Sequence, residues 1–204
     1  MGCNSEFSSL RLKLDEAITY GTHEEALRLA RQGREAASAK GFLAEEEYFK
    51  GQEELLNGNF ASAIEHFDAA IKINPQDGAA YNDRALSMVE LGIIDEAFYY
   101  FDKGIEAEPD YATIYHNKGW LLNNIGRHSE AIRYFNKALQ LEPHRAVTYD
   151  NLADALLSLR DYRGALSAYR RVLELLNPDS CQEIRQEIGR QIDRLEKILK
   201  QEKP

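Results

Sequence analysis

The side chains best suited to metal binding or redox chemistry are five histidines and two cysteines, and their spacing fits neither role. The two cysteines, Cys3 and Cys181, lie far apart without CxxC spacing, so no redox motif is indicated. Zinc sites usually need paired His or Cys ligands at short spacings. No such pairing occurs among the histidines, which are His23, His66, His116, His128 and His144. The sequence therefore predicts no metal site and no cofactor.

Catalytic patterns are equally weak. Asp and Glu are abundant at 34 residues, but runs such as Glu45-Glu46-Glu47 are typical of a solvated helical surface. No phosphate-binding glycine loop follows an expected strand, because the glycines fall between helical segments. No nucleophile, base and orienting group are expected to converge. We expect a protein that is not an enzyme and has no catalytic residues.

The elements that position all these side chains repeat every 34 residues. Three series share the interval: Pro75, Pro109 and Pro143; Gly58, Gly92 and Gly126; and Ala63, Ala97, Ala131 and Ala165. A period of this length indicates a stack of similar supersecondary units, each burying its apolar face against its neighbours. Function is then expected on a shared surface rather than in a catalytic pocket.

Each unit reads as two helices. In the segment 112–145, apolar or small residues recur every three or four positions up to Ile125, and Gly126 breaks the helix. A second helix carries Ala131 and Phe135 on one face and stops before Pro143, which excludes the preceding residue from the helical region. Small residues predict close helix approach, and bulky aromatics predict the core: Phe67, Phe101, Phe135 and Tyr169.

Charge and hydropathy narrow the classes of partner. The formal net charge of −9 argues against nucleic-acid binding, which needs clustered Lys and Arg, and favours a neutral or basic partner. No stretch of about 18 uncharged apolar residues predicts a membrane span. These features predict a soluble, cytoplasmic protein.

The repeat resembles the tetratricopeptide repeat (TPR) family. The family pattern of small, glycine, aromatic and proline positions is met in the third unit by Gly119, Gly126, Phe135 and Pro143, among others. Four units carry the resemblance, at 44–77, 78–111, 112–145 and 146–179. It implies an all-α fold, a right-handed α-solenoid of antiparallel helix pairs. In the fourth unit Arg160 replaces the glycine, and Asn177-Pro178 is shifted by one place.

Regularity lapses at both ends of the chain. We expect a flexible N-terminus at 1–6, followed by a degenerate TPR-like hairpin at 7–43 that is either a fifth repeat or a capping hairpin. Residues 180–204 are predicted to form a C-terminal capping helix, whose apolar stripe could instead pair two copies of the chain. That stripe consists of Ile184, Ile188, Ile192, Leu195 and Leu199.

The family geometry places the first helix of each unit on the inner, concave wall. The partner-binding residues implied there are Tyr48, Gln52, Asn82, Leu86, His116, Asn117, Trp120, Asn123, Asp150, Asn151 and Asp154. Trp120 is the strongest candidate anchor, although it could instead pack against a neighbouring helix or the N-terminal segment. Asparagine amides could bond a peptide backbone, and aspartates would favour Lys, Arg or an amine.

The expected function is a non-catalytic scaffold that binds a peptide segment or helix of another protein. Acidic chaperone tails are an improbable ligand, because the inner positions lack the Lys and Arg of a carboxylate clamp. One alternative is a self-assembling homo-oligomer. Another is a membrane-attached assembly factor, because Gly2-Cys3-Asn4-Ser5 resembles a lipoprotein's acylated cysteine, although chance or a myristoylation-like start would also produce it.

Overall fold

The computed structural model describes residues 3–176 and 182–201, and within these ranges every regular element is a helix. Contacts divide the chain into unit 1, Met1–Pro109, and unit 2, Asp110–Pro204. The helices of unit 1 are α1 (Cys3–Tyr20), α2 (His23–Lys40), α3 (Leu43–Leu56), α4 (Phe60–Ile73), α5 (Gly78–Glu90) and α6 (Ile94–Ala107). Those described in unit 2 are α7 (Ala112–Asn124), α8 (His128–Leu141), α9 (Ala146–Ser158), α10 (Tyr162–Leu175) and α11 (Gln182–Gln201).

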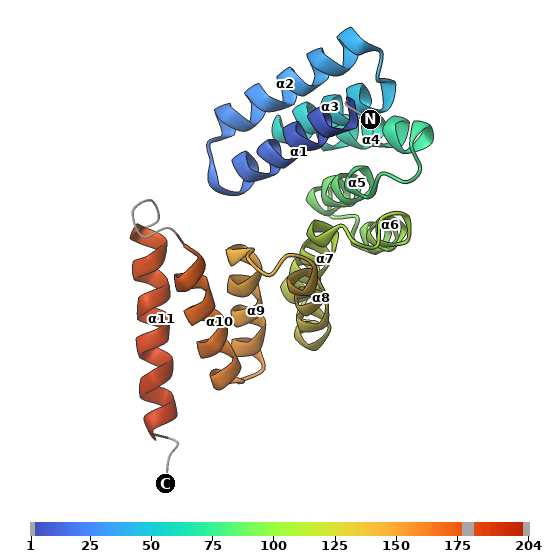
Figure 1. Cartoon of the computed structure of the whole chain (residues 1–204). Coiled ribbons are helices and arrows are strands. Elements are labelled where there is room, and N and C mark those ends of the chain that lie inside the picture. Colours follow the sequence, from blue (N-terminus) through green and yellow to red (C-terminus); the bar gives the residue numbers. More distant parts are fainter. Residues whose placement is uncertain (1–2, 177–181, 202–204) are drawn as a thin grey trace. The chain divides into compact units, whose positions relative to one another are not determined.

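Inside each unit the helices form antiparallel pairs that pack in chain order (Figure 1). In unit 1 the first helices α3 and α5 also contact each other, and in unit 2 the first helices α7 and α9 do so. We call the face that these helices share in each unit its first-helix surface. The predicted fold class, an all-α helical-repeat solenoid, is confirmed.

Helix ends follow the glycine and proline series. Gly58, Gly92 and Gly126 end the first helices with φ between +76° and +82°, a left-handed conformation that costs glycine little. Arg160 holds the equivalent place with φ of 60°, so the chain keeps the same turn without the usual glycine. The second helices α4, α6 and α8 stop two residues before their prolines.

The core is built from the predicted small-against-aromatic contacts. Phe67, Phe101 and Phe135 are completely buried, and Tyr169 is 3% exposed, which confirms their core assignment. A Cβ atom at Gly51 would lie only 2.6 Å from Phe67 Cε1, so a larger residue there would separate α3 from α4. The alanine series, one turn before each aromatic on the same second helix, is completely buried as well.

The N-terminal pair differs from the expected boundaries. Helix α1 begins at Cys3 and therefore includes part of the segment expected to be flexible. Phe7 and Leu14 of α1 are buried, and the Phe7 ring lies 6.5 Å from the Phe49 ring of α3. The α1–α2 hairpin is thus an integral part of unit 1.

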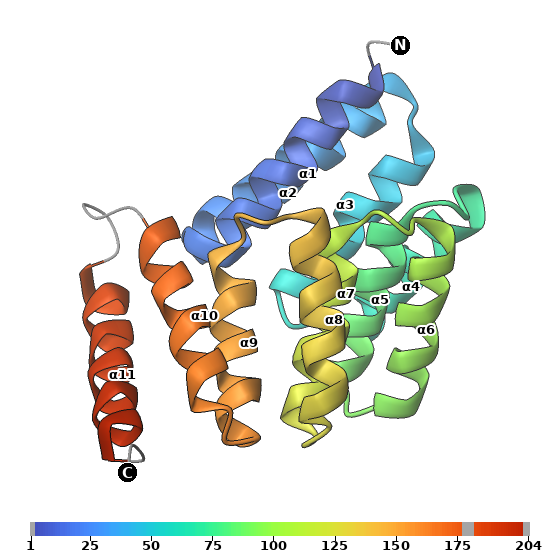
Figure 2. The same ribbon diagram turned by 60° about the horizontal axis from the view of Figure 1, so that its bottom comes forward.

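At the other end, α11 packs against α10 (Figure 2). Ile188 and Leu195 are buried there, whereas Ile184 at the start of the stripe is 51% exposed. Arg185 donates hydrogen bonds to the carbonyl oxygens of Leu173 and Leu176, at 2.7 and 3.0 Å, and so satisfies acceptors at the end of α10. The predicted shift at Asn177-Pro178 lies outside the described residues.

Among the described residues, none of the helices has the length and hydropathy needed to cross a membrane.

Candidate functional site

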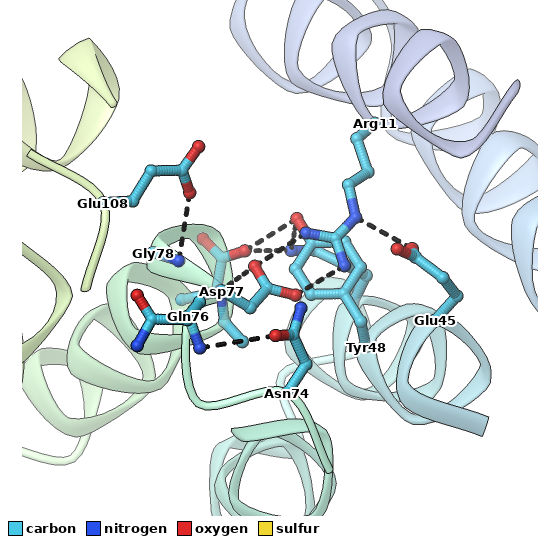
Figure 3. A network of polar contacts seen from close by, with 11 residues as sticks. Arg11, Glu45, Tyr48, Asn74, Gln76, Asp77, Gly78 and Glu108 are labelled. Carbon is cyan, nitrogen blue, oxygen red and sulfur yellow. Dashed lines mark hydrogen bonds and ion pairs between the residues drawn. The ribbon is translucent and has the colours of Figure 1, made fainter. Parts of the chain in front are cut away.

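The first-helix surface of unit 1 holds a guanidinium group from the same chain. Arg11 of α1 donates from both terminal nitrogens to the Asp77 carboxylate, at 2.8 and 2.7 Å, and from Nε to Glu45 at 3.0 Å. Its guanidinium carbon lies 3.6 Å from the centre of the Tyr48 ring. We call these four residues the Arg11 site; they come from α1, α3 and the start of α5 (Figure 3).

Local helix chemistry explains how these groups are positioned. Asp77 is the N-cap of α5, and its Oδ1 accepts a hydrogen bond from the Ala80 amide at 3.1 Å. Glu45 lies in the first turn of α3, one turn before Tyr48. Burial alone would lower the pKa of Arg11, but the charge and hydrogen bonds of Asp77 outweigh it, so that pKa is raised.

Tyr48 connects the Arg11 site to a second polar cluster centred on Asp83. The Tyr48 hydroxyl donates to Asp83 Oδ2 at 3.0 Å, and Asn82 donates to Asp83 Oδ1 at 2.8 Å. Gln52 Nε2 donates to the same carboxylate and to the Tyr48 hydroxyl. Burial raises the pKa of Asp83 to about 7, although the hydrogen bonds from Asn82 and Tyr48 favour its charged form.

Unit 2 has a corresponding buried polar group around His116 of α7. Its Nδ1 lies 2.9 Å from the Thr148 hydroxyl, and the Asn151 amide approaches its Nε2 at 3.5 Å. Burial, together with the charge of Arg145, lowers the pKa of His116 to about 3. The imidazole is therefore neutral at pH 7 and links α7 to α9.

The predicted partner-binding residues fall into a buried group and an accessible group. Tyr48, Gln52, Asn82 and His116 are at most 6% exposed, and each makes at least one internal polar contact through its side chain. The others are partly or fully exposed, namely Leu86, Asn117, Trp120, Asn123, Asp150, Asn151 and Asp154. A partner would reach this second set directly and the first set only through rearranged side chains.

Like Asn151, the accessible residues Asn123 and Asp154 have internal partners in unit 2. Asn123 Oδ1 lies 2.6 Å from His128 Nδ1, and Asp154 accepts a hydrogen bond from the Tyr169 hydroxyl at 2.7 Å. Burial and the neighbouring Asp154 carboxylate raise the pKa of Asp150 to about 6. A cation placed beside Asp150 would relieve this repulsion, which fits the expected preference for Lys, Arg or an amine.

Sequence reasoning missed Arg11, Glu45 and Asp77. Arg11 lies in the degenerate N-terminal pair, where the interval to the next unit is 37 residues rather than 34, as between Gly21 and Gly58. At that interval Arg11 aligns with Tyr48, one of the predicted inner positions. Asp77 could have been identified by its place in the sequence, since an aspartate directly before a helix is a typical N-cap.

The buried His116 predicts a pH-dependent stability for unit 2. Unfolding restores its pKa to 6.5, so the unfolded state binds more protons below that pH and the native state loses stability as pH falls toward 3. Between pH 7 and pH 5 the loss from this group should be about 2 kcal/mol. Urea unfolding of the wild type and His116→Asn at both pH values would measure it.

The comparison with His116→Asn is needed because two aspartates act in the opposite direction. Asp83 and Asp150 have raised pKa values, so they add stability on acidification in both proteins. The difference between wild type and variant isolates the histidine. An equal response of both proteins to pH would contradict a neutral, buried His116.

Antiparallel helix pairs with recurrent small-against-aromatic contacts define a helical-repeat protein. Family models described as tetratricopeptide repeat match residues 50–112, 112–145 and 148–183. The chain belongs to the tetratricopeptide repeat family.

Curated relatives align with only part of the chain. It is 30% identical over 104 residues to Hsp70-Hsp90 organizing protein 1 of Glycine max, covering 46% of this chain and 18% of the relative. It is 39% identical over 54 residues to Hsp70-Hsp90 organizing protein of Triticum aestivum, covering 26% and 9%. The chain thus spans less than a fifth of the length of these relatives.

Solved structures share the fold at low sequence identity. TTC0263, a thermophilic TPR protein of Thermus thermophilus, superposes with a TM-score of 0.72 at 21% identity, covering 90% of this chain and 96% of that one. The MamA protein gives a TM-score of 0.58 at 18% identity, covering 83% and 91%.

Proposed function

We propose that this protein is a non-catalytic scaffold that binds a peptide segment or helix of a partner protein on its first-helix surfaces. Membership of the family supports a protein-binding role, because stacked helical repeats present extended surfaces that such proteins use for binding. The accessible residues on α7 and α9 include an aromatic side chain, amides and carboxylates, which are groups that can contact a peptide.

The observation that carries this proposal is the partly exposed Trp120. Its neighbour Gly119 faces the Phe135 ring, and a Cβ atom at Gly119 would lie 2.9 Å from Phe135 Cδ1. The packing side of α7 is therefore full, while Trp120 retains solvent exposure on the adjoining side. A large aromatic at such a place is a typical binding hot spot.

Trp120→Ala should weaken partner capture at least about tenfold, since truncating a hot spot typically costs about 2 kcal/mol or more and about 1.4 kcal/mol corresponds to tenfold in affinity. Affinity capture from a cell lysate, read by quantitative mass spectrometry, would identify the partner with the wild type and measure its loss with the variant. Tyr99→Ala is the matched control, because Tyr99 is a 55% exposed aromatic on a second helix. Equal recovery of the partner by wild type and Trp120→Ala, with helical content preserved, would contradict the assignment.

The expected partner is neutral or basic. In the described ranges no cation pairs with Asp150, and the whole chain carries a net charge of −9. The names of the plant relatives mention Hsp70 and Hsp90, but the short alignments do not extend those partners to this chain. An acidic chaperone tail remains a disfavoured ligand, because Asp150 and Asp154 would repel it.

A self-assembling homo-oligomer is the main alternative, and the exposed Ile184 on α11 is the observation that favours it. Sedimentation at several concentrations separates the two functions, because a monomer at every concentration excludes self-assembly. The lipid-anchored alternative depends on Cys3, whose side chain lies outside the described residues. Intact-mass measurement of the native product would decide between acylation and the proposed cytoplasmic location.

A further inference from the structure

We propose that Glu45, Tyr48 and Asp77 form an arginine-binding site of unit 1, that Arg11 is its internal ligand, and that an arginine of the partner replaces it. This inference rests on the proposed function, because it names one side chain that the bound peptide would carry. It also predicts a direct, small-molecule binding activity that can be measured without the partner.

The site is complementary to a guanidinium in shape as well as charge. Asp77 receives two parallel hydrogen bonds, Glu45 receives a third, and the flat group lies 3.6 Å from the Tyr48 ring centre. A lysine ammonium is a point charge that cannot make the parallel pair and stack on a ring at the same time. The site should therefore prefer arginine to lysine.

Two of the three walls of the site, Asp77 and Tyr48, are held in place by contacts that do not involve Arg11. The Asp77 carboxylate caps α5 through the Ala80 amide, and the Tyr48 hydroxyl is fixed by Asp83 and Gln52. Because α3 and α5 themselves supply these groups, removal of Arg11 should leave a preorganised site with two carboxylates. Preorganisation reduces the cost of binding a new ligand.

Exchange of the occupant requires only movement of the Arg11 side chain. That side chain is 18% exposed and Glu45 is 22% exposed, so the site opens to solvent on one side. Helix α1 itself is held by other buried residues, namely Phe7, Leu10, Leu14 and Ala17. Arg11 can therefore leave while α1 stays packed on α2.

An internal ligand competes at an effective concentration on the order of millimolar. Free arginine should consequently bind the wild type poorly, whereas a peptide with further contacts along the surface can displace Arg11. Arg11 thereby sets a threshold that selects partners with an arginine and additional contacts.

The test uses Arg11→Ala and the probe N-acetyl-arginine N-methylamide, with the lysine analogue as its comparison. We expect saturable binding to Arg11→Ala by NMR titration, with a Kd on the order of millimolar and at least about tenfold preference over the lysine analogue. The wild type should not saturate in that range. The control variant Arg28→Ala, which removes a 64% exposed arginine, should behave as the wild type. Adding Asp77→Asn to Arg11→Ala should abolish binding.

The proposal is overturned if Arg11→Ala binds the arginine analogue no better than the lysine analogue or no better than Arg28→Ala does. Arg11 would then be a structural ion-pair partner only. Should Arg11→Ala unfold, recovery of its helical circular dichroism by the arginine analogue alone would support the site, and no recovery would count against it. Trp120→Ala added to Arg11→Ala should retain probe binding, so failure of the proposed groove function remains distinguishable from failure of this site.

Discussion

Phe101→Ala should lower the free energy of unfolding of unit 1 by about 4 kcal/mol, the middle of the range for an aromatic removed from a core. Phe101 is completely buried on α6, beside the equally buried Ala97 and Gly104. Because the core is close-packed and the ring is fully buried, the cavity left by Phe101→Ala would close only in part. Urea unfolding followed by circular dichroism would measure the loss.

Tyr99→Ala on the same helix is the matched control. Tyr99 is 55% exposed, and its contacts are a neighbouring tyrosine ring and a lysine 5.8 Å from its centre. Its truncation should change the free energy of unfolding by no more than about 0.5 kcal/mol. A similar loss in both variants would show that α6 is destabilised by lost helix contacts in general rather than by a core cavity.

The helical-repeat fold could be predicted because the 34-residue interval encodes the turn, packing and stop positions of each helix pair. In the third unit Gly126 allows the turn between the two helices, and Ala131 allows the helices to approach closely. Phe135 fills the core, and Pro143 ends the second helix. Each contact joins residues within one unit or between neighbours, so the pattern transfers from unit to unit. The turn does not strictly require glycine, since Arg160 adopts a left-handed φ at the position where glycine is usual.

The polar contacts between first helices could not be predicted in the same way. Arg11 reaches Asp77 across 66 residues, and its helix lies in the pair where the interval lengthens to 37. A residue at an inner position can either face solvent or bond to the next first helix, and the period does not distinguish these outcomes. Tyr48 and His116 bond to the next helix, while Trp120 keeps solvent exposure.

Asp77→Ala should lower the free energy of unfolding of unit 1 by about 4 kcal/mol, for two separate reasons. It leaves the largely buried Arg11 without its main counter-charge, and breaking a buried pair typically costs about 3 kcal/mol or more. It also removes the acceptor for the Ala80 amide at the start of α5, a cap that contributes about 1 kcal/mol. Urea unfolding at pH 7 would measure the sum.

Asp161→Ala separates these two contributions. Asp161 caps α10 by accepting a hydrogen bond from the Gly164 amide at 2.9 Å, and it is exposed at the surface. Asp161→Ala should therefore lower the free energy of unfolding by about 1 kcal/mol, which is the contribution of the cap alone. The loss in the free energy of unfolding for Asp77→Asn should lie between those of Asp77→Ala and Asp161→Ala, because asparagine can keep the cap while the charge is lost. Equal losses from Asp77→Ala and Asp161→Ala would mean that the Arg11–Asp77 pair adds no net stability, because desolvation of the two charges would then offset their attraction.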